Sequence, residues 1–152
     1  MMRCLAVLLS SLALAACGAE KAVEPAKPHR SPSAAAVIRA WADALRGGDV
    51  ARAAGFFALP SVVSNGTPPI VLRTPDEVRT FNESLPCGAV LQRTYREGRY
   101  TAAVFRLTER PGPGRCGTGT GASARTAFVV RDGKIRQWRR LAQPEAPPAP
   151  VV

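Results

Sequence analysis

Apolar side chains recur at the period of an α-helix between residues 37 and 45. They fall at i, i+1, i+4, i+5 and i+8, and so share one helical face: Val37, Ile38, Trp41, Ala42 and Leu45. Gly47 and Gly48 follow directly, and glycine is common just beyond the end of a helix. The sequence therefore predicts an amphipathic helix with Trp41 on its buried face.

Two more helices are predicted after this glycine pair. Asp49 can cap the first, which stops before Pro60. Its inward-facing residues would be Val50, Ala53, Ala54 and Phe57. The second begins at Thr74-Pro75-Asp76-Glu77, a capping box with proline in the first turn, and ends at Pro86. Its buried face would hold Val78, Phe81 and Leu85.

The remaining apolar segments are typical of β-strands. They cover residues 61–65, 70–73, 89–96, 99–108, 124–131 and 134–141. Two tight hairpins are predicted, at Glu97-Gly98 and at Asp132-Gly133, and the first would set Tyr95 opposite Tyr100. Residues 110–123 lie between the hairpins, and their prolines and glycines predict a long exposed loop.

The amino-terminal residues have the pattern of an export signal. A positive charge at Arg3 precedes an apolar run that ends at Leu14-Ala15-Ala16-Cys17. The run of about eleven residues is too short to span a bilayer, which needs about 20. Small residues followed directly by cysteine resemble a bacterial lipobox. Cys17 is therefore expected to become the lipid-bearing first residue, anchoring an exported protein to a bacterial membrane, inner or outer.

The two ends of the chain differ in composition from its centre. Residues 1–16 form the predicted signal peptide, and residues 17–33 form a polar, proline-containing linker behind the lipidated cysteine. Residues 143–152 (QPEAPPAPVV) predict a disordered tail. Between them, residues 34–142 have the size of one domain with a single hydrophobic core.

The chain is basic, with a net charge of +10, and contains four cysteines. Export excludes nucleic acid as a partner, and the arginines are spread over every element instead of forming one block. Their charge suits anionic headgroups or envelope polymers, or simply a solvated surface. Cys4 leaves with the signal and Cys17 carries lipid, so Cys87 and Cys116 remain as a predicted disulfide. No metal site is expected, because the only histidine, His29, is in the linker.

Three helices, a short strand pair and a curved antiparallel sheet predict an α+β cone. Residues 37–58 (VIRAWADALRGGDVARAAGFFA) resemble the opening of nuclear transport factor 2-like domains, which include SnoaL-like proteins, polyketide cyclases and ketosteroid isomerases. Residues 128–138 (FVVRDGKIRQW) resemble the last hairpin of that family. The resemblance implies a cone-shaped sheet packed on three helices. It implies no single activity, because this fold carries enzymes and binding proteins alike.

The acid–base residues of ketosteroid isomerases are not found at the matching positions. Trp41 stands where the resemblance places a tyrosine, and Asn65 where it places the base. Indole is a weak donor, and an amide takes up no proton near neutral pH. The strands at residues 89–96 and 124–131 contain no carboxylate. No catalytic residue and no cofactor are therefore expected.

Aromatic side chains could line a ligand cavity between sheet and helices, or simply fill the core. The candidate pocket residues are Trp41, Phe57, Asn65, Phe81, Tyr95, Tyr100, Phe128 and Trp138. The favoured function is a non-catalytic, membrane-anchored module that binds a small apolar ligand or an envelope protein, with a homodimer left open. The alternative is an enzyme of the same fold with unfamiliar residues. A filled cone would favour protein interaction, and an open pocket with a polar group at its base would favour the enzyme.

Overall fold

The computed structural model describes residues 31–142. Their order is α1 (Ala34–Arg46), α2 (Val50–Ala54), β1 (Phe57–Ser64), β2 (Ile70–Leu72), α3 (Pro75–Ser84), β3 (Gly88–Glu97), β4 (Tyr100–Thr108), a 3₁₀ turn η1 (Gly117–Gly119), β5 (Ser123–Arg131) and β6 (Lys134–Leu141). The predicted signal peptide, Cys17, the linker as far as residue 30 and the tail at 143–152 lie outside these residues. Within residues 31–142, no helix is long and apolar enough to cross a membrane.

The helices begin where capping side chains predict. Ser33 accepts a hydrogen bond from the backbone N–H of Ala36 at the start of α1. Thr74 and Glu77 form the predicted capping box of α3, with Pro75 in its first turn. The apolar face of α1 is buried from Val37 to Leu45 as its periodicity requires.

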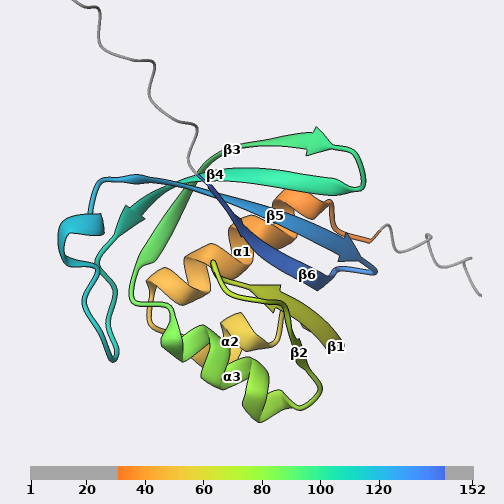
Figure 1. Ribbon diagram of the computed structural model, residues 1–152, viewed down its shortest axis with the longest axis horizontal. Helices are drawn as coiled ribbons and strands as arrows, with labels where there is room; N and C mark the ends of the chain where they lie inside the picture. The colour runs from red at the N-terminus through yellow and green to blue at the C-terminus, as the bar shows by residue number, and fades with distance from the viewer. Residues whose placement is uncertain (1–30, 143–152) are drawn as a thin grey trace, which may run out of the picture.

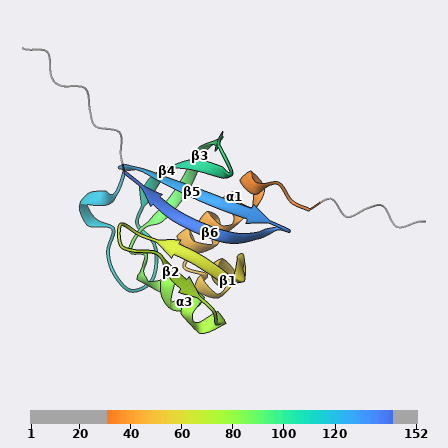
Figure 2. The same ribbon diagram turned by 45° about the vertical axis from the view of Figure 1, so that its right-hand side comes forward.

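The six strands form one curved sheet in the order β2-β1-β6-β5-β4-β3. Neighbouring strands are antiparallel except β1 and β6, which run parallel. The three helices lie on one side of the curved sheet (Figures 1 and 2). We call this side the inner face and the other side the outer face. This arrangement confirms the predicted α+β cone and makes its sheet mixed.

Phe57 is not in the second helix as predicted. That helix ends at Ala54 with Gly55 as its cap, and Phe57 is the first residue of β1, paired with Ile135. The backbone N–H of Ile135 donates to the carbonyl oxygen of Phe56 over 2.8 Å. The helical pattern failed here because an aromatic pair after glycine also suits the start of a buried strand.

The register of the first hairpin also differs from the prediction. Tyr95 pairs with Ala102, and Tyr100 pairs with Glu97. The two turn residues are Gly98 and Arg99, and Gly98 has a φ of 57°. A hairpin turn whose first central residue has a positive φ favours glycine at that position. The turn therefore begins at Gly98 and lies one residue further along the chain than predicted.

Candidate functional site

A cavity of about 220 Å³ lies between the inner face of the sheet, α1 and the segment after α3. Its lining consists of Trp41, Asn65, Leu85, Pro86, Cys87, Ala89, Phe105, Leu107, Gly119, Ala124, Thr126, Trp138 and Arg140. Most of these side chains are apolar. Three of the lining residues, Asn65, Pro86 and Arg140, are exposed, so the cavity opens to the surface of the cone; we call the part beside Asn65 and Arg140 its mouth.

Three of the eight predicted pocket residues line this cavity: Trp41, Asn65 and Trp138. Three others surround Trp41 or Trp138 without lining it: Phe57, Phe81 and Phe128. Trp41 has edge-to-face contacts with Phe128 and Trp138, with ring centroids 5.6 and 6.4 Å apart. These packed rings fix the positions of the two indoles that form the floor of the pocket.

Tyr95 and Tyr100 do not contribute to the pocket. They lie on the outer face of the sheet, in register with the outward positions of β4 and β5. The hydroxyl of Tyr95 accepts a hydrogen bond from Arg125 over 2.6 Å, and the ring of Tyr100 lies 5.2 Å from the guanidinium of Arg139. Both the predicted and the observed register put the two tyrosines on one face, and sequence alternation alone does not say whether that face is inner or outer.

The indole N–H of Trp41 is bonded inside the protein and is not available to a ligand. It donates to Asn82 Oδ1 over 2.9 Å, and Asn82 in turn donates to the carbonyl oxygen of Val78. Asn82 is completely buried. Trp41 therefore presents only its apolar ring surface to the pocket.

A row of polar side chains crosses the inner face at the mouth of the pocket. Arg140 on β6 pairs with Thr126 on β5. Asn65 follows Ser64, which pairs with Arg139, and so comes level with Arg140 on the other side. Thr126 is buried, whereas Asn65 and Arg140 are exposed. We refer to Asn65, Arg140 and Thr126 as the polar row.

Sequence reasoning found Asn65 but missed Thr126 and Arg140 as site residues. The available signal was alternation along β6, where Arg140 comes two residues after the buried Trp138 and thus faces the same side. Among residues 31–142, the guanidinium of Arg140 has no hydrogen bond or ion pair, and the single ion pair there joins Arg46 to Asp43. Its positive charge is free to meet a ligand.

Trp138, which lines the pocket with its ring, carries an unpaired buried donor. Its side chain is 5% exposed, and its Nε1–H has no hydrogen-bond partner in the described part of the chain. An unpaired buried donor is costly, by about 1–3 kcal/mol.

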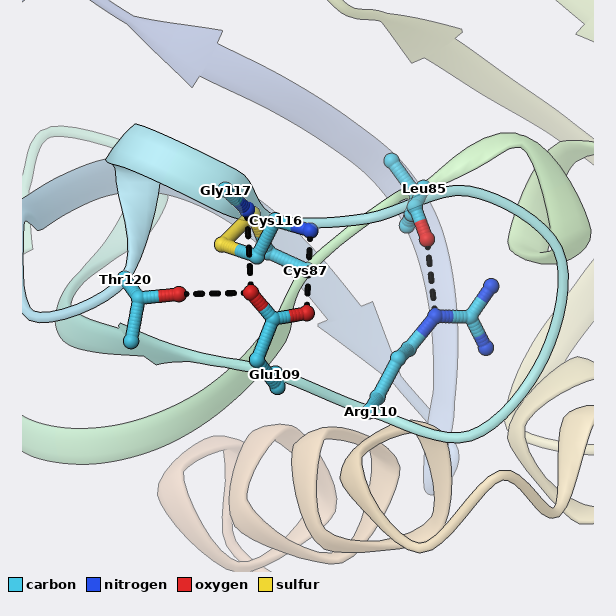
Figure 3. The surroundings of a disulfide bond; sticks show 7 residues. All are labelled: Leu85, Cys87, Glu109, Arg110, Cys116, Gly117 and Thr120. Atoms are coloured by element: carbon cyan, nitrogen blue, oxygen red, sulfur yellow. Dashed lines mark hydrogen bonds between the residues drawn. A yellow bond between two sulfur atoms is a disulfide. The ribbon is translucent and has the colours of Figure 1, made fainter.

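A disulfide joins Cys87, which lines the pocket, to Cys116 in the loop after β4. Figure 3 shows this bond and its surroundings. Formation of the disulfide confirms the predicted pairing. Cys87 and Gly119 both line the cavity, so the loop after β4 is part of the site. The loop is also less exposed than predicted, because Arg110 and Cys116 are buried.

The carboxylate of Glu109 holds the same loop by hydrogen bonds. It accepts hydrogen bonds from Thr120 Oγ1 at 2.9 Å and from the backbone N–H groups of Cys116 and Gly117 at 3.2 and 3.0 Å (Figure 3). These bonds, that from Thr120 first, hold the pKa of Glu109 below its ordinary value because they favour the charged carboxylate.

Arg110 ties the loop to the end of α3. Its Nε donates to the carbonyl oxygen of Leu85 over 2.8 Å, and a terminal nitrogen donates to those of Glu83 and Asn82. Burial lowers the pKa of this guanidinium from its ordinary value. Arg110 thus satisfies carbonyl groups that a helix leaves unpaired at its end, and it fixes the residues before the disulfide.

No aspartate, glutamate or histidine appears in the cavity lining within residues 31–142. The same residues contain no group of three or more His, Cys, Asp or Glu side chains that could hold a metal ion. The polar groups that this lining offers a ligand are the guanidinium of Arg140, the amide of Asn65 and the hydroxyl of Thr126.

An open, curved six-stranded sheet with three helices inside it defines the nuclear transport factor 2-like class of folds. Residues 38–138 match the family model of the SnoaL-like domain. The chain belongs to this family. No protein with curated annotation matches the sequence.

Solved structures share the fold at low sequence identity. A nuclear transport factor 2-like protein of unknown function from Cytophaga hutchinsonii is 10% identical, with 74% of this chain and 92% of that chain covered and a TM-score of 0.56. A candidate ketosteroid isomerase from Kribbella flavida is 19% identical, with 75% and 82% covered and a TM-score of 0.53. A protein with a ketosteroid isomerase-like fold from Catenulispora acidiphila, solved with trimethylamine, is 15% identical, with 74% and 87% covered and a TM-score of 0.51.

Proposed function

We propose that this SnoaL-like domain binds a small, mainly apolar ligand in the cone and releases it unchanged. The observation that carries the proposal is the open cavity of about 220 Å³ with its largely apolar wall. Drug-sized ligands occupy pockets of about 300–1,000 Å³, so a smaller molecule is expected. A pocket of this size suits a small molecule better than an envelope protein.

The lack of proton-transferring groups supports binding without turnover. General acid–base catalysis needs a side chain that titrates near the working pH and lies within reach of the reacting atom. The lining within residues 31–142 offers an amide, a hydroxyl, an indole and a guanidinium. None of these is an efficient general base near neutral pH.

Titration with a neutral apolar probe tests the proposal. The probe is 1-octanol, and binding is followed by calorimetry and by the fluorescence of Trp41 and Trp138. Ala124→Phe fills the pocket and should abolish binding, whereas Val129→Phe introduces the same ring on the outer face and should leave binding intact. Failure of the unmodified chain to bind, or equal loss in both variants, would contradict the proposal.

The second candidate function is catalysis by residues other than those that ketosteroid isomerases use. The observation that favours it is the polar row at the mouth of the pocket. Isomerisation of a ketosteroid by the purified protein tests it. Turnover that survives purification and disappears in Asn65→Ala or Asp43→Asn would replace the binding proposal. We expect no turnover, since Asp43 is exposed and pairs with Arg46 instead of lining the cavity.

We also propose that Cys17 anchors the protein to a bacterial membrane. The support is the apolar run that ends in Leu14-Ala15-Ala16-Cys17. Two acyl chains give stable attachment, at about 0.8 kcal/mol for each buried CH₂ group. The domain would then present its pocket at the cell envelope.

A further inference from the structure

We propose that the pocket takes a small apolar carboxylate, with the carboxylate held at the polar row and the apolar part inside the cone. This inference rests on the proposed function and adds the chemical class of the ligand. Three features of the described residues carry it: a free guanidinium at the mouth, neutral donors on either side of it, and an apolar interior.

The polar row is placed by the sheet itself. Pairing of Arg140 with Thr126 sets these residues opposite each other on adjacent antiparallel strands. Directly opposed residues have Cβ atoms about 4.5–5.5 Å apart. The parallel β1–β6 pairing brings Asn65 to the other side of Arg140. One small group at the mouth can therefore reach all three side chains.

The charge at the mouth is not neutralised by the protein. Arg140 has no ion pair in the described part of the chain, and the cavity lining there contains no carboxylate. A guanidinium presents two parallel N–H donors that match the two oxygens of a carboxylate. One guanidinium offsets one negative charge, so a monoanion fits better than a doubly charged phosphate.

The interior fits the rest of such a molecule. Below the polar row, the rings of Trp41 and Trp138 form the floor, and the walls consist of Phe105 with aliphatic and small residues. The volume of about 220 Å³ is below the range of about 300–1,000 Å³ that drug-sized ligands occupy, which indicates a small ligand such as a single short alkyl chain with its head group.

Octanoate and 1-octanol form a matched pair of probes, because they share an eight-carbon chain and differ only in the head group. Both are titrated into the purified Cys17→Ser chain, in which no attached lipid competes with them. At low ionic strength we expect octanoate to bind at least tenfold more tightly than 1-octanol. The preference should shrink as salt is added, because Arg140 is exposed and its charge is screened.

Arg140→Gln and Arg139→Gln provide the control. Arg139 is the adjacent residue on the same strand, and its guanidinium lies over Tyr100 on the outer face. Arg140→Gln should weaken octanoate binding about tenfold and leave 1-octanol binding unchanged, while Arg139→Gln should change neither. Equal affinity for the two probes in the unmodified chain, or equal losses in the two variants, would overturn the carboxylate proposal alone. Failure of both probes to bind would overturn it together with the proposed function.

Discussion

Trp41 donates its indole N–H to the Oδ1 atom of Asn82, 2.9 Å away, across 41 positions of the chain. The bond joins α1 to α3 at the base of the pocket, and both residues are buried. It also keeps the donor of Trp41 out of the cavity. The shape of the pocket floor therefore depends on this pair.

Replacing Asn82 by alanine should destabilise the fold by about 1–3 kcal/mol, because it leaves the buried N–H of Trp41 without an acceptor. The free energy of unfolding is measured by denaturant titration. Ser84→Ala removes an exposed hydrogen bond from the same helix and should change stability by no more than about 0.5 kcal/mol. Equal effects of the two changes would show that the Trp41–Asn82 bond contributes nothing of its own.

The disulfide should contribute about 3 kcal/mol to stability, since Cys87 and Cys116 are 29 positions apart and the bond restricts the unfolded chain. The double change Cys87→Ala and Cys116→Ala should lower the free energy of unfolding by that amount. Mass spectrometry of an unreduced digest should find the two cysteine-containing peptides linked. Recovery of both peptides with free thiols would disprove the pairing.

Glu109 should make stability depend on pH. Its pKa is lowered in the folded protein, so its contribution is present above the ordinary pKa of about 4.5 and is lost as the pH falls through the lowered value. Glu109→Gln should therefore be less stable than the unmodified protein at pH 7, with the difference narrowing below pH 4.5. Glu97→Gln, at the exposed β3–β4 hairpin, is the matched control for removing one surface carboxylate. Parallel pH profiles for Glu109→Gln and the unmodified protein would contradict this.

Cys17→Ser should release the protein from the membrane. The substitution removes the only predicted attachment point for lipid. Even one myristoyl chain gives only marginal membrane binding, so a protein without any lipid should not stay attached. Membrane and soluble fractions are compared by immunoblot in the producing bacterium. Unchanged fractionation would rule out Cys17 as the anchor.

Local signals in the sequence predicted the local structure well. The capping box at Thr74 starts α3, and Asp132-Gly133 forms the last turn with φ angles of 52° and 71°. Both depend on a few adjacent residues, so the sequence carries the whole signal. The disulfide could also be predicted, because the predicted signal peptide and lipid site use two of the four cysteines and leave one way to pair the others.

Features that depend on distant segments were missed or misplaced. Phe57 joins a strand because it pairs with Ile135, 78 positions later in the chain, and no local pattern reports that pairing. Arg140 reaches the pocket because β6 lies between β1 and β5 in the sheet. A basic residue in a strand is read as solvent-facing until the strand order shows which face closes the cone.

The position of a bound apolar ligand tests the central claim most directly. The chain has two tryptophans, both of which line the cavity, so intermolecular nuclear Overhauser effects from the methyl group of 1-octanol can be assigned without ambiguity. We expect contacts to the ring protons of Trp41 and Trp138 and to the methyl group of Ala124. Contacts confined to Tyr95 and Tyr100 on the outer face, or none at saturating 1-octanol, would contradict a ligand-binding cone.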